Sequence, residues 1–419
     1  MPTIDLKYGK ASLPVEFDDH RFDVLLGGEQ SPVLNDLEIS QRLDHPIDSP
    51  PIDDVVQPGE TVLIVVPDAT RQTGCGQIVN LLVRRLIASG TAPHDIRIIF
   101  ATGIHRGVTD QEKAAVLTPF IAQRIKTLNH DPRDIARLVR LGKTSGGITV
   151  EIDRAVFEHD HVILIGGVSF HYFAGFTGGR KLICPGLASA RTIAATHKLA
   201  FDFEKRSRRS GVDTGVLDGN AVHEAFVDSV ELAPPAFSIN SIVDNDGAAI
   251  ELFCGDWKAS HRAACEAYAT ANTVSLTEKR SLVIASCGGS PHDINLIQAH
   301  KAIEAASNAC TEGGTIIVLA ECPDGLGRAD FLDWFDAPNS MELAAKLCEK
   351  YQVNGQTAWS LLAKAERFDI NLVTTLPASQ VRKMRLTPSA TLDEAIKNVA
   401  PLTRGYILPG GARLAIRAA

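Results

Sequence analysis

Ionisable residues follow four short apolar runs of the sequence, at the points where strands are expected to end. They stand in Asp68-Ala-Thr-Arg71, Thr102-Gly-Ile-His105-Arg106, Ser169-Phe-His171 and Cys287-Gly-Gly-Ser-Pro-His-Asp293. Ligands of open parallel sheets bind beyond the carboxyl ends of the strands. Four such ends together predict an active site on one rim, rich in groups that accept or donate protons.

Three histidines are candidates for acid–base chemistry or metal binding. His105 and His171 each follow a predicted strand, and as a pair they could serve as two general acid–base groups near neutral pH. Taken singly, each is more often a structural histidine. His197 lies in the predicted helix 188–199, where it could be the single protein ligand of a metal whose other ligands come from a cofactor.

A glycine-rich stretch follows the third strand. Gly178-Gly179-Arg180-Lys181 could hold a phosphate through backbone N–H groups and positive charge, although the same residues also suit a basic surface turn. The chain has no G-x-x-x-x-G-K-[ST] and no G-x-G-x-x-G that opens a helix after a strand. The missing dinucleotide fingerprint argues against a conventional nucleotide-dependent oxidoreductase.

A second group of polar residues lies on a predicted helix in the last third of the chain. Gln298 and Lys301 are three residues apart and share a helical face. That face could simply be solvated. Alternatively, Lys301 and Arg71 could close on a substrate carboxylate across an interdomain cleft, with Arg71 binding both oxygens.

Alternating strands and helices must position these residues. Thr61–Pro67 and Val162–Ile165 are continuous apolar runs, typical of strands buried on both faces, and Ile96–Ala101 is a third strand. A capping box at 109–112 opens one of the intervening helices. The order of strands and helices predicts parallel pairing.

The second half of the chain repeats this alternation after an interruption. Phe237–Val243 and Ala248–Phe253 flank a turn signal and predict a hairpin, a long helix follows at about 257–272, and Ser281–Ala285 opens a second series. We therefore predict two α/β domains with mainly parallel, Rossmann-like sheets and an interdomain cleft. Residues 1–274 would bind the cofactor, and residues 275–419 would form the second domain, with a tail that could pack back on the first.

The composition limits the partners. The 419 residues include 42 Lys and Arg against 50 Asp and Glu, a net charge of −8, without a long basic run. This charge balance argues against nucleic acid and against a membrane as a partner. Eight dispersed cysteines and the lack of an 18-residue apolar run predict a reduced, cytoplasmic protein.

The order and spacing of the motifs resemble the nickel-pincer-nucleotide-dependent lactate racemase family, which comprises 2-hydroxy acid racemases and epimerases. The resemblance runs from about residue 60 to at least residue 300, and it rests on Asp68-Ala-Thr-Arg71, Gly103-Ile-His105-Arg106, Ser169-Phe-His171, Gly178-Gly-Arg-Lys181, His197 and Gln298-Ala-His-Lys301. It implies an isomerase that inverts C2 of a 2-hydroxy acid by proton-coupled hydride transfer to a covalently bound nickel-pincer nucleotide.

The resemblance also implies a role for each matching residue. The cofactor would be pyridinium-3,5-bisthiocarboxylic acid mononucleotide nickel, joined to Lys181 as a thioamide, with His197 as the protein ligand of the nickel. His105 and His171 would be the catalytic acid–base pair. Asp68, Thr70, Gly178 and Gly179 would contribute to cofactor binding. The substrate would be bound by Arg71, Lys301, Gln298, Phe173 and Trp359.

The substrate side chain stays open at this point. Lactate, malate or another 2-hydroxy acid would fit the chemistry, and a second carboxylate could meet His300, Arg106, Arg180 or His292. The alternatives are a sugar-acid 2-epimerase with the same cofactor and a non-catalytic cofactor- or nickel-binding protein. Expected partners are a small-molecule 2-hydroxy acid and the cofactor biosynthesis enzymes, and a homo-oligomer is left open.

Overall fold

The computed structural model describes residues 1–28, 31–69, 71, 73–397, 399–400 and 403–418. The chain forms two compact units. The larger unit comprises Glu29–Ala200 and Ser210–Tyr268, and the smaller unit comprises Met1–Gly28, Phe201–Arg209 and Ala269–Ala419. Each contains one six-stranded, mainly parallel sheet with helices, so the predicted α/β fold class is confirmed.

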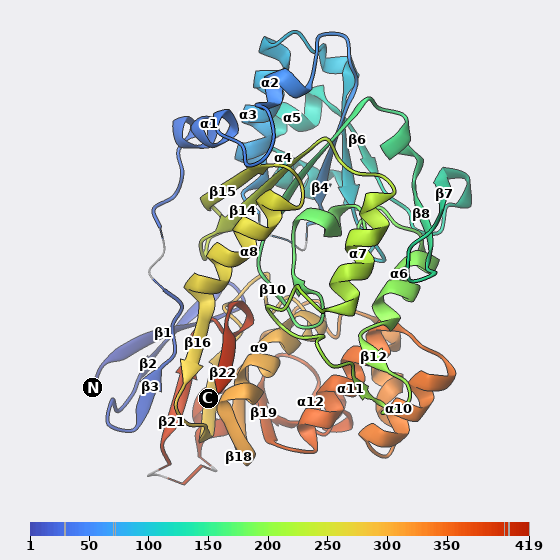
Figure 1. Cartoon of the computed structure of the whole chain (residues 1–419). Helices are drawn as coiled ribbons and strands as arrows, with labels where there is room; N and C mark the ends of the chain where they lie inside the picture. The colour runs from blue at the N-terminus through green and yellow to red at the C-terminus, as the bar shows by residue number, and fades with distance from the viewer. Residues whose placement is uncertain (29–30, 70, 72, 398, 401–402, 419) are drawn as a thin grey trace. The chain divides into compact units, whose positions relative to one another are not determined.

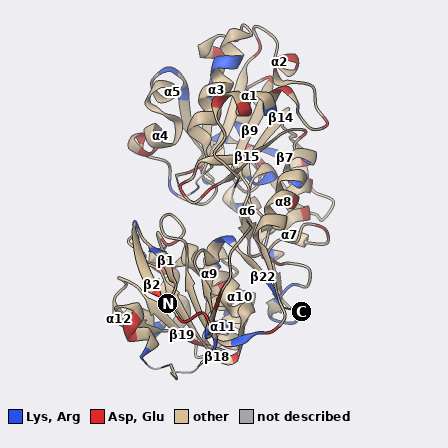
Figure 2. Ribbon diagram, turned by 90° about the vertical axis from the view of Figure 1, so that its left-hand side faces the viewer, with Lys and Arg blue, Asp and Glu red and all other residues tan. Residues whose placement is uncertain are grey.

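The sheet of the larger unit carries the first three predicted strand ends. Its strands run in the order β15 (Ala249–Gly255), β14 (Phe237–Val243), β9 (His161–Gly167), β4 (Val62–Pro67), β5 (Ile96–Ala101) and β6 (Lys126–Asn129). All neighbours are parallel except β14 and β15, which form the predicted antiparallel hairpin. Strands β9 and β14 contain no Lys, Arg, Asp or Glu and are drawn in tan (Figure 2).

Helices cover both faces of this sheet (Figure 1). Every residue of β4 is buried, and successive side chains point to opposite faces. Ile64 packs in the core that includes α3, and Val65 packs in the core that includes α6 and α7. The helices of this unit are α1 (Asp36–Asp44), α2 (Ile52–Val55), α3 (Cys75–Ala88), α4 (Asp110–Leu117), α5 (Pro119–Arg124), α6 (Ala190–Lys198), α7 (Ala221–Glu231) and most of α8 (Ala259–Asn272).

The smaller unit has an all-parallel sheet. Its strands run in the order β20 (Thr387–Ser389), β19 (Asp369–Val373), β18 (Cys310–Leu319), β17 (Arg280–Ser286), β21 (Gly405–Leu408) and β3 (Phe22–Val24). Its helices are α9 (Leu296–Ala309), α10 (Ser340–Glu349), α11 (Val353–Ala365), α12 (Ala378–Lys383) and α13 (Leu392–Ile396). The hairpin of β1 (Thr3–Tyr8) and β2 (Ala11–Glu16) precedes β3, and β16 (Thr273–Leu276) pairs with β22 (Ala415–Ala418).

The division into units differs from the expected cut at residue 274 in three segments, one of which is the short stretch 269–274 that belongs to the smaller unit. Strand β3 pairs with β21, so the first 28 residues belong to the smaller unit (blue beside red in Figure 1). Residues 201–209, which form the short strands β12 (Phe201–Asp202) and β13 (Ser207–Arg208), also belong to it. Phe201 packs edge-on against Trp359 at 5.1 Å between ring centroids. Local periodicity identifies strands but not the sheet that each strand joins.

Local signals of helix starts had two outcomes. The capping box at Thr109 and Glu112 is complete. The sequence Thr391-Leu-Asp-Glu394 has the same S/T-x-x-E pattern, but there the Thr391 hydroxyl accepts from the Glu394 N–H while the Glu394 carboxylate accepts from the Ala390 N–H, so no capping box closes. The antiparallel hairpin of β7 (Leu138–Lys143) and β8 (Thr149–Asp153) was not expected. In the described part of the chain, no helix has both the length and the apolar character needed to cross a bilayer.

Candidate active site

The sheet of the larger unit has a topological switch point between β4 and β9. The chain continues from β4 to β5 and β6 on one side, whereas β9 and β14 lie on the other. The loops that leave β4 and β9 therefore diverge, and such a point is where open α/β sheets bind ligands. Asp68 follows β4, His105 follows β5 and His171 follows β9, so three adjacent strands deliver them to one edge.

Asp68 and His105 form a directed pair at this edge. The Asp68 carboxylate lies 2.7 Å from Nδ1 of His105, with the carboxylate side chain 8% exposed and the imidazole 43% exposed. An ionised carboxylate can only accept hydrogen bonds, so Nδ1 of His105 carries the proton and donates it to Asp68. Nε2 of His105 is then the basic nitrogen, on the more exposed side chain of the pair.

His171 is held by a tight hairpin and by aromatic rings. It lies on β10 (Phe170–His171), which pairs with β11 (Gly175–Phe176). The Ala174 N–H donates to Nδ1 across 3.3 Å. The ring of Phe173 lies edge-on to the imidazole at 4.4 Å, and the ring of Tyr172 stacks on it at 5.6 Å. These contacts orient the ring with Nε2 on the side away from Ala174.

The glycine-rich loop is shaped by its neighbours. Gly179 has φ +47°, and a Cβ there would lie 2.6 Å from Cδ2 of His261. Its N–H donates to Oδ1 of Asn240 across 3.0 Å. This N–H is therefore engaged within the protein, and the glycine serves to carry the chain past His261 into the 3-10 helix η4 (Gly179–Leu182), which bears Lys181.

Lys181 and His197 contact the same two aromatic rings. The Lys181 ammonium lies 5.9 Å from the centre of the Phe173 ring and 5.7 Å from that of Phe226. The His197 imidazole lies 5.2 Å from Phe173 and 5.4 Å from Phe226, measured between ring centroids. The structure thus brings together two predicted cofactor residues that are 16 positions apart in the sequence.

The hydrogen bonding of His197 leaves one nitrogen suited to a metal. Nδ1 lies 2.8 Å from the Ile193 carbonyl and donates to it, so Nε2 carries the lone pair. Burial, and then the charge of Lys181, lower the pKa of His197 to about 3. The imidazole is therefore neutral at physiological pH, as a metal ligand must be.

These donors fit a metal that is held mainly by a cofactor. Across the described residues, no three His, Cys, Asp or Glu side chains gather in a way that could hold a metal ion. One neutral imidazole beside a half-buried lysine can supply a single ligand and an attachment point. The predicted cofactor needs those two contributions from the protein.

The remaining predicted substrate residues are distributed over both units. Arg71 is half-buried in a turn, with its N–H donating to the Asp68 carbonyl across 3.2 Å. Gln298 and Lys301 are half-buried in the first turns of α9, and Trp359 packs on Phe201. Thr70 lies outside the described residues. The pairing of Arg71 with Lys301 stays a prediction.

Of the four candidates for binding a second carboxylate, two are bonded within the protein and a third is buried. Arg106 makes two hydrogen bonds to the Glu112 carboxylate. Arg180 is 1% exposed and donates to the Ala174 carbonyl across 2.8 Å, and His300 is also 1% exposed. Arg106 and Arg180 therefore bond within the protein, and His300 is shielded from solvent.

Two residues that shape the site were not predicted from the sequence. Phe226, on α7, supplies the second ring beside Lys181 and His197, and Asn240, on β14, holds Gly179. No motif marks either residue, because both act through contacts made only after the helices pack on the sheet.

Two long segments of the chain match the models of known protein families. Residues 8–209 match the lactate racemase N-terminal domain, and residues 276–405 match the lactate racemase C-terminal domain. The lactate racemase of Thermoanaerobacterium thermosaccharolyticum is 28% identical over the full length of both chains. That of Lactiplantibacillus plantarum is 33% identical over 79% of this chain and 77% of its own.

Solved structures agree as well. The lactate racemase apoprotein from Thermoanaerobacterium thermosaccharolyticum superposes with a TM-score of 0.90 at 28% identity, covering 99% of this chain and all of the other. A protein from Thermotoga maritima shares the fold, with a TM-score of 0.72 at 19% identity over 93% of this chain and all of its own. From its matching domains and relatives, the chain belongs to the lactate racemase family and is an isomerase.

Proposed function

We propose that the protein racemises a 2-hydroxy acid, with lactate as the first candidate, using a nickel-pincer nucleotide attached to Lys181. The observation that carries the proposal is the position of Lys181 beside His197, between the rings of Phe173 and Phe226. Attachment and metal ligation need these two side chains close together. The relatives that share both domains are themselves lactate racemases.

The side chains of this protein would supply the proton chemistry. When bound, the cofactor would provide the acceptor and the source of the hydride at C2. His105 accepts the hydroxyl proton at Nε2, since Asp68 holds the proton on Nδ1 and stabilises the imidazolium that forms. His171 returns a proton to the oxygen after inversion from its imidazolium form, in which Nδ1 also carries a proton and the bond from the Ala174 N–H is released. Each turnover moves one proton from His171 to His105, and the reverse turnover moves it back.

The remaining predicted residues would bind the substrate and enclose the reacting atoms. Arg71, together with Lys301 and Gln298 of the smaller unit, is predicted to hold the substrate carboxylate. Phe173 is buried against His171, Lys181 and His197, and it would exclude water from the reacting atoms. Asp68 would act through His105, and the cofactor-binding role predicted for it stays a prediction.

The alternatives receive less support. The internal pairing of Arg106 with Glu112 and the burial of Arg180 and His300 remove most groups that a malate or a sugar acid would need. A cofactor carrier without turnover is set aside because the chain belongs to an enzyme family.

The test uses protein loaded with cofactor and nickel, incubated in D₂O with single enantiomers of lactate, malate and a sugar acid. Chirality and deuterium at C2 are followed together. Inversion of lactate without deuterium at C2 is the expected result. Inversion with deuterium would show proton abstraction instead, and no inversion of any acid by protein whose cofactor is confirmed by mass would contradict the proposal.

A further inference from the structure

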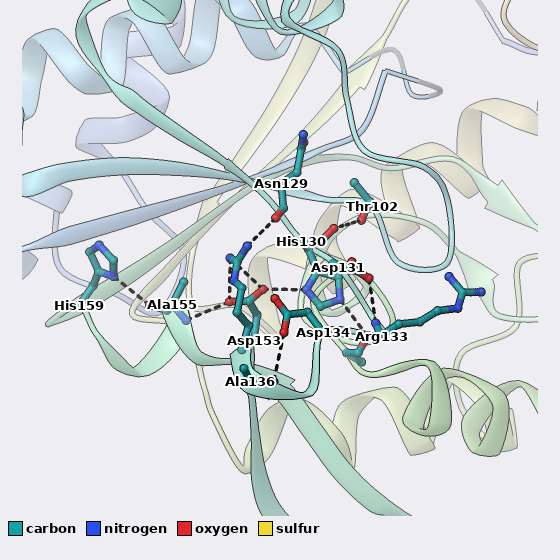
Figure 3. Close-up of polar contacts among 12 residues, drawn as sticks. Thr102, Asn129, His130, Asp131, Arg133, Asp134, Ala136, Asp153, Ala155 and His159 are labelled. Carbon is teal, nitrogen blue, oxygen red and sulfur yellow. Dashed lines mark hydrogen bonds and ion pairs between the residues drawn. The ribbon is translucent and has the colours of Figure 1, made fainter.

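His130 is a buried histidine outside the predicted site, and it links three segments that carry residues of that site. His130 follows β6, and its side chain is fully buried. Nδ1 lies 2.8 Å from Oδ2 of Asp153, and Nε2 lies 3.0 Å from the Ala188 carbonyl. Dashed lines in Figure 3 join His130 to Asp153 and to Thr102.

Both nitrogens of this ring face acceptors. A carbonyl oxygen can only accept, so Nε2 carries a proton. The Asp153 carboxylate is ionised: burial opposes this, but the hydrogen bonds from His130 and the Ala155 N–H, together with Arg137, hold its pKa below the usual range. Nδ1 therefore donates as well, so both ring nitrogens are engaged in hydrogen bonds within the protein.

The backbone of His130 and its neighbour hold the loop that bears His105. The Thr102 hydroxyl donates to the His130 carbonyl across 2.9 Å. The Asn129 side chain pairs with both backbone groups of Val108, donating to the carbonyl at 2.9 Å and accepting from the N–H at 3.1 Å. Asn129 and His130 thus form hydrogen bonds with both ends of the segment 102–108.

The imidazole of His130 holds the segment between Lys181 and His197. Ala188, whose carbonyl accepts from Nε2, directly precedes Ser189, the N-cap of α6. The Asp153 N–H donates to the Leu187 carbonyl across 2.9 Å, beside the same cap. Helix α6 carries His197.

We propose that His130, buried and hydrogen-bonded between Asp153 and the Ala188 carbonyl, is a positioning residue that fixes the His105 loop relative to the start of the His197 helix. The importance of those two histidines rests on the proposed function. The contacts of His130 do not depend on it, since every group involved belongs to the larger unit of this chain. Its role is distinct from that of His105, because no basic nitrogen is left on its ring.

The first test is NMR of the protein labelled with ¹⁵N-histidine, without cofactor. In the wild type, both ring nitrogens of His130 should show protonated-type shifts. In His130→Gln, the ring signals of His105 and His197 should move together. In Thr102→Val, which cuts only the link to the His105 loop, the signal of His105 should move and that of His197 should stay.

The matched control is His161→Gln. His161 also bonds a carboxylate, with 2.6 Å between Nε2 and Oε2 of Glu60, but it begins β9 and so lies at the amino ends of the strands. This variant should move neither signal. A folded His130→Gln with unmoved His105 and His197 would overturn the proposal. If that variant fails to fold, a neutral His130 ring in the wild type or an unmoved His105 in Thr102→Val would do so.

Activity of the loaded enzyme gives a second readout. The racemisation kcat of His130→Gln should fall roughly 10- to 100-fold with KM nearly unchanged, as for other residues that act behind a reacting group. An unchanged kcat would contradict the positioning role. Loss of racemisation in the loaded wild type would count against the proposed function alone, because the NMR result is obtained without cofactor.

Discussion

The Asp68 carboxylate accepts a hydrogen bond from Nδ1 of His105 across 2.7 Å. This bond selects the tautomer in which Nε2 can accept a proton, and it stabilises the imidazolium that forms. Asp68→Asn should therefore lower kcat about 100-fold with little change in KM, because the proposed role of this carboxylate is to orient His105.

The measurement is the rate of inversion of a single lactate enantiomer, followed by chiral chromatography on cofactor-loaded protein. Asp110→Asn is the control, since this exposed carboxylate pairs with Lys113 on the surface of α4. A wild-type rate for Asp68→Asn would show that the bond does not tune His105.

Substitutions of Lys181 and His197 should have different effects on the bound cofactor and the nickel. Lys181→Ala should lack the covalent cofactor mass, because the attachment amine is gone. His197→Ala should keep the covalent mass but lose nickel, because only the metal ligand is gone. Intact-protein mass spectrometry and metal analysis read the two quantities separately.

Lys198→Ala is the control for both, since its exposed side chain neighbours His197 in sequence. Covalent cofactor on Lys181→Ala, or full nickel on His197→Ala, would mean that the roles are misassigned. His105→Ala and His171→Ala should keep both cofactor and nickel while losing turnover.

Gly179 should not tolerate a side chain. Its φ of +47° costs an alanine about 1 kcal/mol. The Cβ would also lie 2.6 Å from the His261 ring, and overpacking of this kind adds about 1–3 kcal/mol. Gly179→Ala should therefore lower the free energy of unfolding and the fraction of protein that accepts cofactor.

Gly147→Ala separates the two causes. Gly147 has φ +79°, and a Cβ added there would meet nothing within 4 Å, so alanine bears the backbone strain without the collision. Denaturant unfolding should show a smaller loss for Gly147→Ala than for Gly179→Ala. Equal losses would rule out the contact with His261 as a cause.

Buried His300 should make stability depend on pH. Burial, and then the charge of Lys364, lower its pKa to about 3, with Glu304 opposing and Arg208 adding to the effect. An unfolded histidine takes up a proton near pH 6.5. The contribution of His300 is thus complete above pH 6.5 and is lost as the pH falls toward 3, by about 2 kcal/mol at pH 5.

Denaturant unfolding at pH 8 and pH 5 measures this loss. His300→Gln should reduce the difference between the two pH values by about 2 kcal/mol. His94→Gln should leave it unchanged, since the side chain of His94 is 83% exposed. A difference that is the same in His300→Gln and wild type would contradict the prediction.

Much of the fold was readable from local sequence. Strand β5 spans the predicted Ile96–Ala101, and the hairpin of β14 and β15 forms around the predicted turn. These elements are specified by residues adjacent in the chain, through apolar runs and turn chemistry. The partners of β3 were not readable, because pairing with β21 joins residues almost 400 positions apart.

The sequence by itself determined which side chains follow the strands of the larger unit. The order and spacing of these side chains resembled the motifs of one family. Tertiary structure alone decided how those side chains are used. Asp68 orients His105, Asn240 takes the Gly179 N–H, and Phe226 completes the surroundings of Lys181. Each of these contacts joins residues 37 or more positions apart. Hydrogen bonds and ring contacts act over a few ångströms in space, so they exist only once the sheet and its helices have packed.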